Sequence, residues 1–249
     1  MRHLDRRESD PKKSMQIAVI SDLHLGEGDR ADGFGHDDAE FLRFLGFLER
    51  NFEHIVLLGD IWETLASAKL GDPAGALRRA RHAHPEIAQR FLLPRYAYVH
   101  GNHDLVAGVV DRAPEHIVLQ GDGTRVLFTH GHHHDVLFRS GRWLADFGVW
   151  LGGWLLRIGL SPLYRAFAAL DNLRCGVAPD GKRCSFQRWA VSAARGFDAD
   201  VVVTGHTHLP ARTEHGDRLF LNSGSCAEGR FSFSSLDTKT GSYAIHASW

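Results

Sequence analysis

The chain has 249 residues, of which 43% are hydrophobic and 24% are charged, and its formal net charge is −1. This length suits one α/β domain with an insertion, and it is enough to bury a sizeable core. A chain so close to neutral has no general attraction to the phosphates of nucleic acid, so no nucleic-acid partner is expected. The sequence also lacks an uncharged apolar run long enough to cross a membrane.

The N-terminal residues and the cysteines bear on where in the cell the protein is expected. Residues 1–14 are polar and charged, and we expect them to form a flexible lead-in to a domain over 15–249. They lack the apolar core of a signal peptide. The three cysteines, Cys175, Cys184 and Cys226, form no C-x-x-C pair, and their odd number favours a reducing compartment. A cytoplasmic location is therefore expected, and a disulfide between Cys175 and Cys184 is the disfavoured alternative.

The first half of the chain alternates predicted strands with predicted helices. A strand is predicted at 15–21, and a helix begins near Asp37 after a loop rich in Gly and Asp. That helix places three apolar side chains on one face, namely Phe41, Leu45 and Leu48. A second strand ends at Gly59. The further elements of this half are a helical stretch at about 74–91 and strands near 95–99, 116–120 and 124–129.

A predicted helical insertion covers about 136–197. Residues 136–172 have the pattern of one or two amphipathic helices broken near 159–162, and 185–197 have the pattern of another helix. The last quarter of the chain is rich in apolar runs punctuated by Gly and Asn, which predicts strands near 200–204, 218–221, 230–236 and 242–247.

Large apolar side chains recur at helical spacing within this insertion, at Trp143, Phe147, Trp150, Leu151 and Trp154. Such a stripe usually packs a helix onto its own domain, and this interpretation is favoured. The alternative is a lid over a functional site, with an apolar face that meets an acyl chain or the membrane interface. Both can hold together, because a helix has more than one face.

Five short polar motifs follow five apolar runs of the predicted strands. Buried strands that end in polar groups at one sheet edge are how α/β proteins build active sites. We therefore expect the side chains of these motifs to meet in one place. The motifs are Asp22-Leu23-His24, Gly59-Asp60, Gly101-Asn102-His103-Asp104, Thr129-His130-Gly131 and Gly205-His206-Thr207-His208.

The side chains of these motifs are good ligands for divalent metals, and no cysteine is among them. Two cations about 3.5–4 Å apart need a shared anionic ligand, and Asp60 is the natural bridge. Asp22 and His24 can converge on one ion only if the strand end turns, as Leu25-Gly26 permits. One of the last two histidines is expected at each ion. The predicted metal ligands are Asp22, His24, Asp60, Asn102, His130, His206 and His208.

Two residues beside Asn102 are candidates for a catalytic role without binding metal. His103 is held near the ions by its neighbour, and an imidazole with a pKa near working pH is a plausible general acid. Asp104 is a catalytic candidate as well, although a brace that binds backbone amides of the loop is the favoured interpretation. The run from His132 to His134 is left out of the ligand set, because a solvated loop or a contact with substrate phosphate is commoner for such a run.

The series D-x-H, G-D-x-x-E, G-N-H-D, T-H-G and G-H-T-H resembles the calcineurin-like metallophosphoesterase superfamily over residues 16 to about 235. The resemblance implies a four-layer α-β-β-α sandwich of two mixed sheets. It also implies that a metal-bridging hydroxide attacks phosphorus in line, while His103 stabilises the transition state or protonates the leaving group. Glu63 occupies the place of an acid that orients this histidine. The implied ligand sets are Asp22, His24, Asp60 and His208 for one ion, and Asp60, Asn102, His130 and His206 for the other.

The helical insertion is similar to that of the UDP-2,3-diacylglucosamine pyrophosphatases, which cleave a nucleotide-sugar pyrophosphate in lipid A synthesis. That resemblance implies manganese, an insertion that caps acyl chains, and a cytoplasmic enzyme, with peripheral contact to the inner membrane as an alternative. Members of that branch carry Arg where this chain has His103, and a shorter acidic motif where it has HGHHHD. The resemblance therefore supports phosphoester hydrolysis more firmly than it supports this substrate.

Other functions and metals stay open at this point. The same fold serves cyclic nucleotide phosphodiesterases, phosphatases and nucleases, although a nuclease is expected to show a basic groove with stacking aromatics that is not evident here. A metal-free scaffold that binds partner proteins is disfavoured, because no ligand is lost. Oxygen and imidazole ligands suit iron and zinc as well as manganese. The sequence predicts no oligomeric state.

Overall fold

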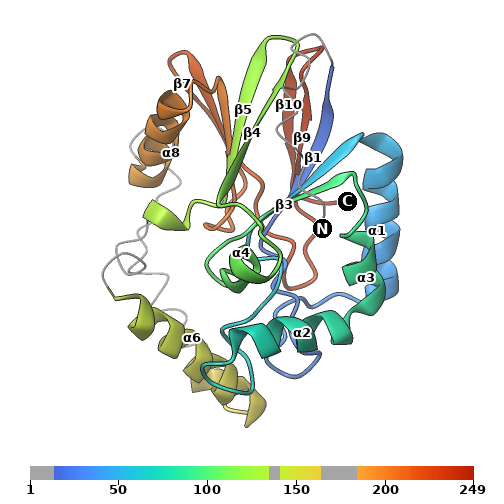
Figure 1. Ribbon diagram of the computed structural model, residues 1–249, viewed down its shortest axis with the longest axis vertical. Coiled ribbons are helices and arrows are strands. Elements are labelled where there is room, and N and C mark those ends of the chain that lie inside the picture. Colours follow the sequence, from blue (N-terminus) through green and yellow to red (C-terminus); the bar gives the residue numbers. More distant parts are fainter. Residues whose placement is uncertain (1–13, 135–140, 164–183) are drawn as a thin grey trace.

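Two five-stranded mixed sheets form the centre of the computed structural model, which describes residues 14–134, 141–163 and 184–249 (Figure 1). The first sheet has the order β10-β9-β1-β2-β3, and β1, β2 and β3 are parallel while β9 runs antiparallel to β1. Its strands are β1 (Gln16–Ile20), β2 (His54–Leu58), β3 (Tyr96–Val99), β9 (Phe233–Asp237) and β10 (Ser242–His246).

The second sheet has the order β4-β5-β6-β8-β7, with a parallel centre and an antiparallel strand at each edge. The parallel strands β5, β6 and β8 put their carboxyl ends at one sheet edge, as β1, β2 and β3 do in the first sheet. The strands are β4 (His116–Gly121), β5 (Thr124–Thr129), β6 (Val201–Thr204), β7 (Ala211–His215) and β8 (Arg218–Asn222).

Alternating side chains of the buried strands divide the core into three parts. Ile17 and Val19 of β1 pack between the sheets with Val126 and Phe128 of β5. Ala18 and Ile20, on the other face, belong to the core that the first sheet shares with its helices, because successive side chains of a strand point to opposite faces. These helices are α1 (Asp38–Asn51), α2 (Pro73–Ala83) and α3 (Pro85–Arg90).

The third part of the core lies between the second sheet and α8 (Ser185–Gly196), which buries Phe186 and Val191 against Leu127 and Val202. Three cores between four layers confirm the predicted α-β-β-α sandwich. Part of the predicted insertion, α8, thus forms the fourth layer of the sandwich.

The helix predicted near Asp37 begins there, since the Asp37 carboxylate accepts a hydrogen bond from the Glu40 amide at 3.1 Å.

Several predicted elements differ from those in the structure. The helical stretch predicted at about 74–91 is present, but it is divided into two helices: α2 ends at Ala83, because Pro85 cannot continue the backbone hydrogen bonds, and α3 begins at Pro85. Strand β7 was not predicted, since its half-buried and exposed residues alternate without an apolar run. The five-residue helix α4 (Val106–Val110) was also not predicted, because it is too short to show a period.

Helix α6 (Arg142–Arg157) lies apart from both sheets, at the lower left in Figure 1. The predicted lead-in at 1–13 and the parts of the insertion at 135–140 and 164–183, which include Cys175, lie outside the described residues. Within the described ranges, no helix combines the length and the hydropathy needed to cross a membrane.

Candidate metal centre

The five polar motifs follow strand ends that meet at one edge of the molecule. The loops after β1 and β2 are joined by backbone hydrogen bonds, from the Asp22 amide to the Gly59 carbonyl at 3.1 Å and from the Leu23 amide to the Asp60 carbonyl at 2.9 Å. In the second sheet, the Gly205 amide donates to the carbonyl of His130 at 3.2 Å. The backbone therefore fixes neighbouring motifs to one another before any side chain is considered.

Five of the predicted ligands have left-handed backbone conformations. Their φ angles are 52° at Asp22, 51° at His24, 51° at Asp60, 69° at His206 and 58° at His208. This conformation costs a non-glycine residue about 1–2 kcal/mol. Such residues persist only where the surrounding structure holds them, and they are concentrated at functional sites. The chain therefore turns at the ligands themselves, and the expectation that Leu25-Gly26 provides the turn for Asp22 and His24 is wrong.

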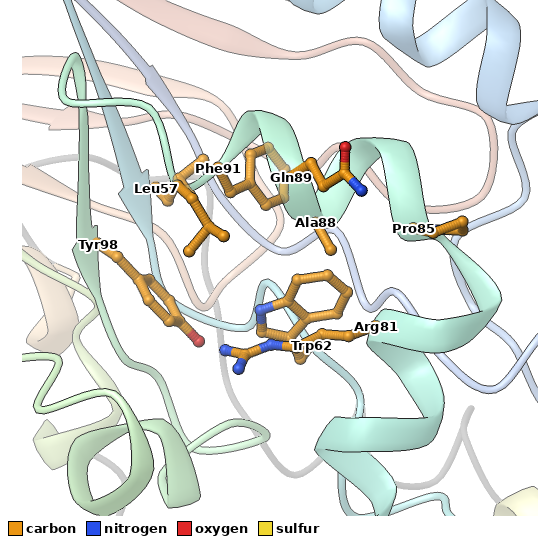
Figure 2. A pocket seen from close by; sticks show the side chains of 9 residues that line it. Leu57, Trp62, Arg81, Pro85, Ala88, Gln89, Phe91 and Tyr98 are labelled. Atoms are coloured by element: carbon orange, nitrogen blue, oxygen red, sulfur yellow. The ribbon is translucent and has the colours of Figure 1, made fainter. Parts of the chain in front are cut away.

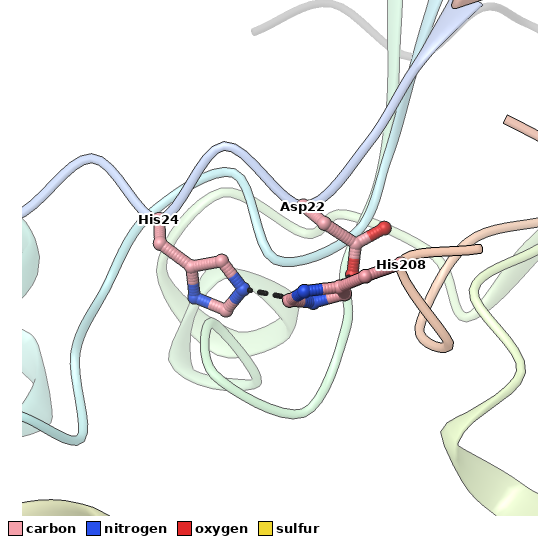
Figure 3. Close-up of side chains that lie close together, drawn as sticks. All are labelled: Asp22, His24 and His208. Atoms are coloured by element: carbon pink, nitrogen blue, oxygen red, sulfur yellow. Dashed lines mark hydrogen bonds and ion pairs between the residues drawn. The ribbon is translucent and has the colours of Figure 1, made fainter. Parts of the chain in front are cut away.

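One group of potential ligands comprises Asp22, His24 and His208, whose ligand atoms all lie within 4.8 Å of one another (Figure 3). The Nε2 atom of His208 is 3.2 Å from Asp22 Oδ1 and 3.4 Å from the Nε2 atom of His24. Two imidazole nitrogens and a carboxylate oxygen converge here from loops that are 184 residues apart in sequence. This donor set suits a borderline divalent cation.

A second group comprises Asp60, His130 and His206. The His130 ring donates from Nδ1 to the Leu58 carbonyl at 2.9 Å, which leaves Nε2 facing Asp60 Oδ2 at 3.2 Å. Asp60 belongs to this second group and not to the first, so its role as the ligand shared by both ions stays a prediction.

Asn102 supplies an independent test of whether a cation fits. Its Oδ1 atom is buried and accepts no hydrogen bond from the residues that the structure describes. A buried carbonyl oxygen without a partner costs free energy, and a cation beside the second group would satisfy it. The neighbouring His103 amide donates to Asp60 Oδ1 at 2.8 Å, so the loop that carries Asn102 is tied to that group.

Glycine is required next to these side chains because the backbone comes so close to them. A Cβ atom at Gly59 would lie 2.4 Å from the His130 ring, and one at Gly101 would lie 2.2 Å from Asp60 Oδ1. Real side-chain atoms do not approach so closely, so any larger residue would displace a predicted ligand.

Glu63 connects two histidines of the site. Its Oε2 atom accepts a hydrogen bond from Nδ1 of His103 at 2.6 Å and lies 3.2 Å from Nδ1 of His24. Its Oε1 atom accepts the amides of Leu65 and Ala66, both at 2.8 Å. With Nδ1 held by the carboxylate, each ring presents Nε2 to the centre, as in the carboxylate–histidine pairs that support metal sites.

The contact between Glu63 and His103 was predicted, whereas the contact with His24 was not. The sequence carries no signal for it, because His24 and Glu63 are 39 residues apart and their loops meet only in the folded chain. The rings of His24 and His103 also lie edge to face, with 4.6 Å between centroids.

Asp104 is fully buried and binds backbone and phenol donors. It accepts the amides of Gly101 at 2.6 Å and Ile61 at 2.8 Å, and longer bonds of 3.3 Å from the amides of Asp60 and Trp62. The Tyr98 hydroxyl donates to the same carboxylate at 2.6 Å. These contacts are those of a brace that joins the loops after β2 and β3. Among the described residues, the carboxylate that bonds the His103 ring is that of Glu63.

The charged neighbours divide the histidines into two kinds. Burial lowers the pKa of His103, but the carboxylates of Glu63 and Asp60 outweigh it and raise that pKa to about 10. Burial and the neighbouring His130 lower the pKa of His206 to about 4. In the metal-free protein His206 is thus neutral, whereas His103 retains a proton. His130 is like His103 in this respect, because Asp60 and Asp22 outweigh burial and raise its pKa to about 9, so this ring must lose a proton to bind a metal.

A group of hydroxyls supports Asp22 from behind, through contacts that the sequence did not predict. The Ser21 hydroxyl donates to Asp22 Oδ2 and lies 2.8 Å from Ser223 Oγ. Ser225 Oγ donates to the Asp22 carbonyl at 3.0 Å, and the Asn222 side-chain amide donates to the Gly205 carbonyl at 2.7 Å. The sequence signal for this group is that polar residues follow two apolar runs: Ser21 comes directly after β1, and Asn222, Ser223 and Ser225 stand at and after the end of β8.

A cavity of about 270 Å³ lies between α3 and the first sheet (Figure 2). None of the predicted ligands lines it, so this cavity is separate from the ligand groups. The side chains around it are Leu57, Trp62, Arg81, Pro85, Ala88, Gln89, Phe91, Leu92 and Tyr98.

Comparison with known proteins places the chain among phosphoesterases. The family model described as calcineurin-like phosphoesterase matches residues 15–210. The UDP-2,3-diacylglucosamine hydrolase of Shigella dysenteriae serotype 1 (strain Sd197) is 30% identical over 213 residues, which cover 79% of this chain and 83% of that protein. The protein of the same name from Escherichia coli (strain K12 / DH10B) has the same identity and coverage.

Solved structures with a similar arrangement are more remote. That of vacuolar protein sorting 29 from Cryptosporidium parvum is 14% identical, with a TM-score of 0.47 over 94% of this chain and 97% of that chain. A likeness at this level carries no information about activity.

Proposed function

Because this chain belongs to the calcineurin-like phosphoesterase family, we propose that it hydrolyses a phosphodiester or pyrophosphate bond with two divalent metal ions. Membership of the family, together with the relatives named as hydrolases, makes it a hydrolase of phosphoesters. The number of ions, their ligands and the substrate are our proposals beyond this family membership.

The observation that carries the proposal is that two of the three groups of potential ligands among the described residues lie side by side, with His130 Nε2 of one group 4.0 Å from Asp22 Oδ1 of the other. We assign Asp22, His24 and His208 to one ion and His130, His206 and Asn102 to the other, with Asp60 shared between them. Two divalent cations held in this way would neutralise the charge of a phosphate, lower the pKa of water and align the attacking and leaving oxygens. Manganese is the metal we propose, with iron or zinc as alternatives for these donors.

His103 is the residue we assign to the leaving group. Its Nδ1 proton is held by Glu63 at 2.6 Å, and the raised pKa of about 10 keeps a second proton on Nε2 at neutral pH. When the bond between phosphorus and the leaving oxygen breaks, that oxygen takes the Nε2 proton. Glu63 keeps the ring oriented and stabilises its positive charge. Asp104 holds the loop that carries His103, and we assign it a supporting role only.

The substrate we propose is a lipid-linked nucleotide similar to UDP-2,3-diacylglucosamine. The relatives that support it are named for this compound. Helix α6 supports it as well, because a stripe of large apolar side chains on it faces solvent: Trp143 is 72% exposed, Phe147 44%, Trp154 44% and Ile158 48%. At about 100° per residue these four positions lie within about 60° of one another.

Such a stripe suits an acyl chain or the surface of a membrane. We therefore propose that α6 forms part of a lid over the site and that the enzyme is cytoplasmic, with peripheral contact to the inner membrane through this helix.

A second candidate is a smaller phosphodiester without acyl chains. His103 favours it, because the resemblance stated above implies Arg at this position in the branch that cleaves UDP-2,3-diacylglucosamine and His in the general superfamily pattern. The hydrogen bond to Glu63 shows that this histidine is integrated into the site.

The test uses the full chain stripped of metal and then loaded with Mn²⁺. We expect release of UMP from UDP-2,3-diacylglucosamine, weaker hydrolysis of bis-p-nitrophenyl phosphate and none above background with the Asp60→Asn variant. Hydrolysis of the diester but not of the lipid nucleotide selects the second candidate. If metal addition changes neither reaction, the proposed metal dependence is wrong.

A further inference from the structure

Helix α6 touches the rest of the protein through a glycine. A Cβ atom at Gly153 would lie 2.9 Å from both Cβ and the carbonyl oxygen of Ala66, so the helix backbone meets the loop backbone directly. Only glycine allows this approach, and the contact is therefore specific to one position of the helix.

A second contact of α6 lies one turn further along the helix. Arg157 Nε donates to Asp29 Oδ2 at 2.6 Å, and Asp29 Oδ1 accepts the amide of Ala31 at 2.8 Å. The loop that contains Asp29 continues to Gly33, where an added Cβ would lie 3.4 Å from Cβ of His24. The C-terminal half of α6 thus contacts two loops, one that contains Ala66 and one that contains Asp29.

The first of these loops leads directly to Glu63. The amide of Ala66 donates to Glu63 Oε1 at 2.8 Å, and Oε2 of the same carboxylate holds Nδ1 of His24 and of His103. A continuous set of contacts therefore runs from Gly153 through Ala66 and Glu63 to two histidines of the site. Movement of the Ala66 backbone would change the donors of Glu63, and so the position of the carboxylate.

We infer that α6 positions the site: docking of Gly153 and Arg157 holds the Glu63 loop, and Glu63 in turn orients His24 for the first ion and His103 for the leaving group. The roles of the two histidines rest on the proposed function. Gly153 and Arg157 are positioning residues, since they act through Glu63 and Asp29.

This arrangement has a reciprocal consequence. If docked α6 raises the affinity of the first ion, then binding of that ion must strengthen the docking of α6 by the same factor. The helix with the exposed apolar stripe is the helix that positions Glu63, so an apolar chain that binds the stripe more tightly when α6 is docked would be coupled to the same ion.

The experiment compares Gly153→Ala with Gly196→Ala, in full-length protein. Both put an alanine into a helix, but a Cβ at Gly196 meets no atom within 4 Å. Mn²⁺ binding is measured by calorimetry. We expect Gly153→Ala to weaken one of two ions by about tenfold or more, the usual effect of losing support behind a ligating histidine, while the other ion and the Gly196→Ala protein stay unchanged.

Two measurements do not depend on activity. Hydrogen exchange of the α6 amides should slow when Mn²⁺ is added to the parent protein, and not in Gly153→Ala. In metal-free protein, ¹⁵N chemical shifts should show the Nδ1-protonated form of the His24 ring in the parent and a mixture of tautomers in Gly153→Ala, with Arg157→Ala between them.

Exchange that shows α6 released in Gly153→Ala, together with unchanged Mn²⁺ affinity and unchanged His24 shifts, would overturn the inference. Failure of the parent protein to bind Mn²⁺ would instead overturn the proposed function. The ¹⁵N shifts would still decide whether α6 positions His24, because they are recorded without metal.

Discussion

Glu63 Oε2 lies 2.6 Å from Nδ1 of His103, and both side chains are largely buried. The His103 ring holds the pKa of the Glu63 carboxyl well below its usual range, against the opposing effect of burial. The carboxylate in turn raises the pKa of the ring. Both members of the pair are therefore charged near neutral pH. Glu63 thus links His103, which we assign to proton transfer, to His24, a predicted metal ligand.

Removing the charge of Glu63 should lower the pKa of His103. The Glu63→Gln variant keeps an oxygen that can accept the Nδ1 hydrogen bond but loses the negative charge that stabilises the imidazolium. We expect the pKa of His103 to fall from about 10 towards that of an ordinary histidine. Titration of the histidine ring protons by NMR, in metal-free protein, measures it. His84 serves as the internal control, and an unchanged His103 titration would show that Glu63 is not the source of the shift.

Replacing His103 by alanine should separate chemistry from metal binding. His103 lies in a third group of potential ligands with His24 and Glu63, but its ring donates to Glu63 and it is not among the predicted metal ligands, so His103→Ala should retain both ions. Turnover should fall by about a hundredfold or more, the scale of a lost proton donor. Elemental analysis and steady-state kinetics give the two readouts. Undiminished turnover would remove His103 from the mechanism.

Asp60→Ala should lose metal as well as activity, because the predicted bridge serves both ions. His103→Ala is the matched comparison, since it removes a neighbouring side chain that is not a predicted ligand. Metal content after gel filtration decides the matter. Two ions per chain in Asp60→Ala would mean that the bridge has been assigned to the wrong residue.

His84 gives a prediction about stability that does not involve the metal ions. Its Nδ1 lies 2.7 Å from Asp38 Oδ1 and its Nε2 lies 3.2 Å from Asp32 Oδ2. Burial lowers the pKa of His84, but hydrogen bonds to the two carboxylates raise it above the usual value. A raised pKa in the folded state means that the ion pairs stabilise the fold fully below about pH 6.5, and that this contribution is lost as pH rises through the folded pKa.

The free energy of unfolding of metal-free His84→Asn should therefore be about 1 kcal/mol or more below that of the parent protein near pH 6. The difference should shrink above the folded pKa of His84. Urea denaturation at pH 6 and pH 9 measures it. A difference that grows with pH would mean that the folded protein holds this ring neutral.

The sequence by itself was enough to predict the strands and the side chains at their ends. Buried parallel strands appear as apolar runs such as IAVI and VVVT, and their carboxyl ends share an edge, so Asp22, Asp60 and His206 had to come near one another once the sheets formed. The four-layer fold was predicted from the resemblance of these motifs to the calcineurin-like metallophosphoesterase superfamily. Strand β7 escaped prediction because half-buried polar residues carry no such pattern.

Only the tertiary structure determined which atoms of those side chains face the metal centre. The left-handed backbone at Asp22 and Asp60 is imposed by hydrogen bonds between loops, and no local preference of Asp demands it. The sharing of Glu63 by His24 and His103, and the contact of Gly153 with Ala66, join segments that are distant along the chain. Periodicity reports the surroundings of one segment at a time, whereas these contacts depend on how separate segments pack together.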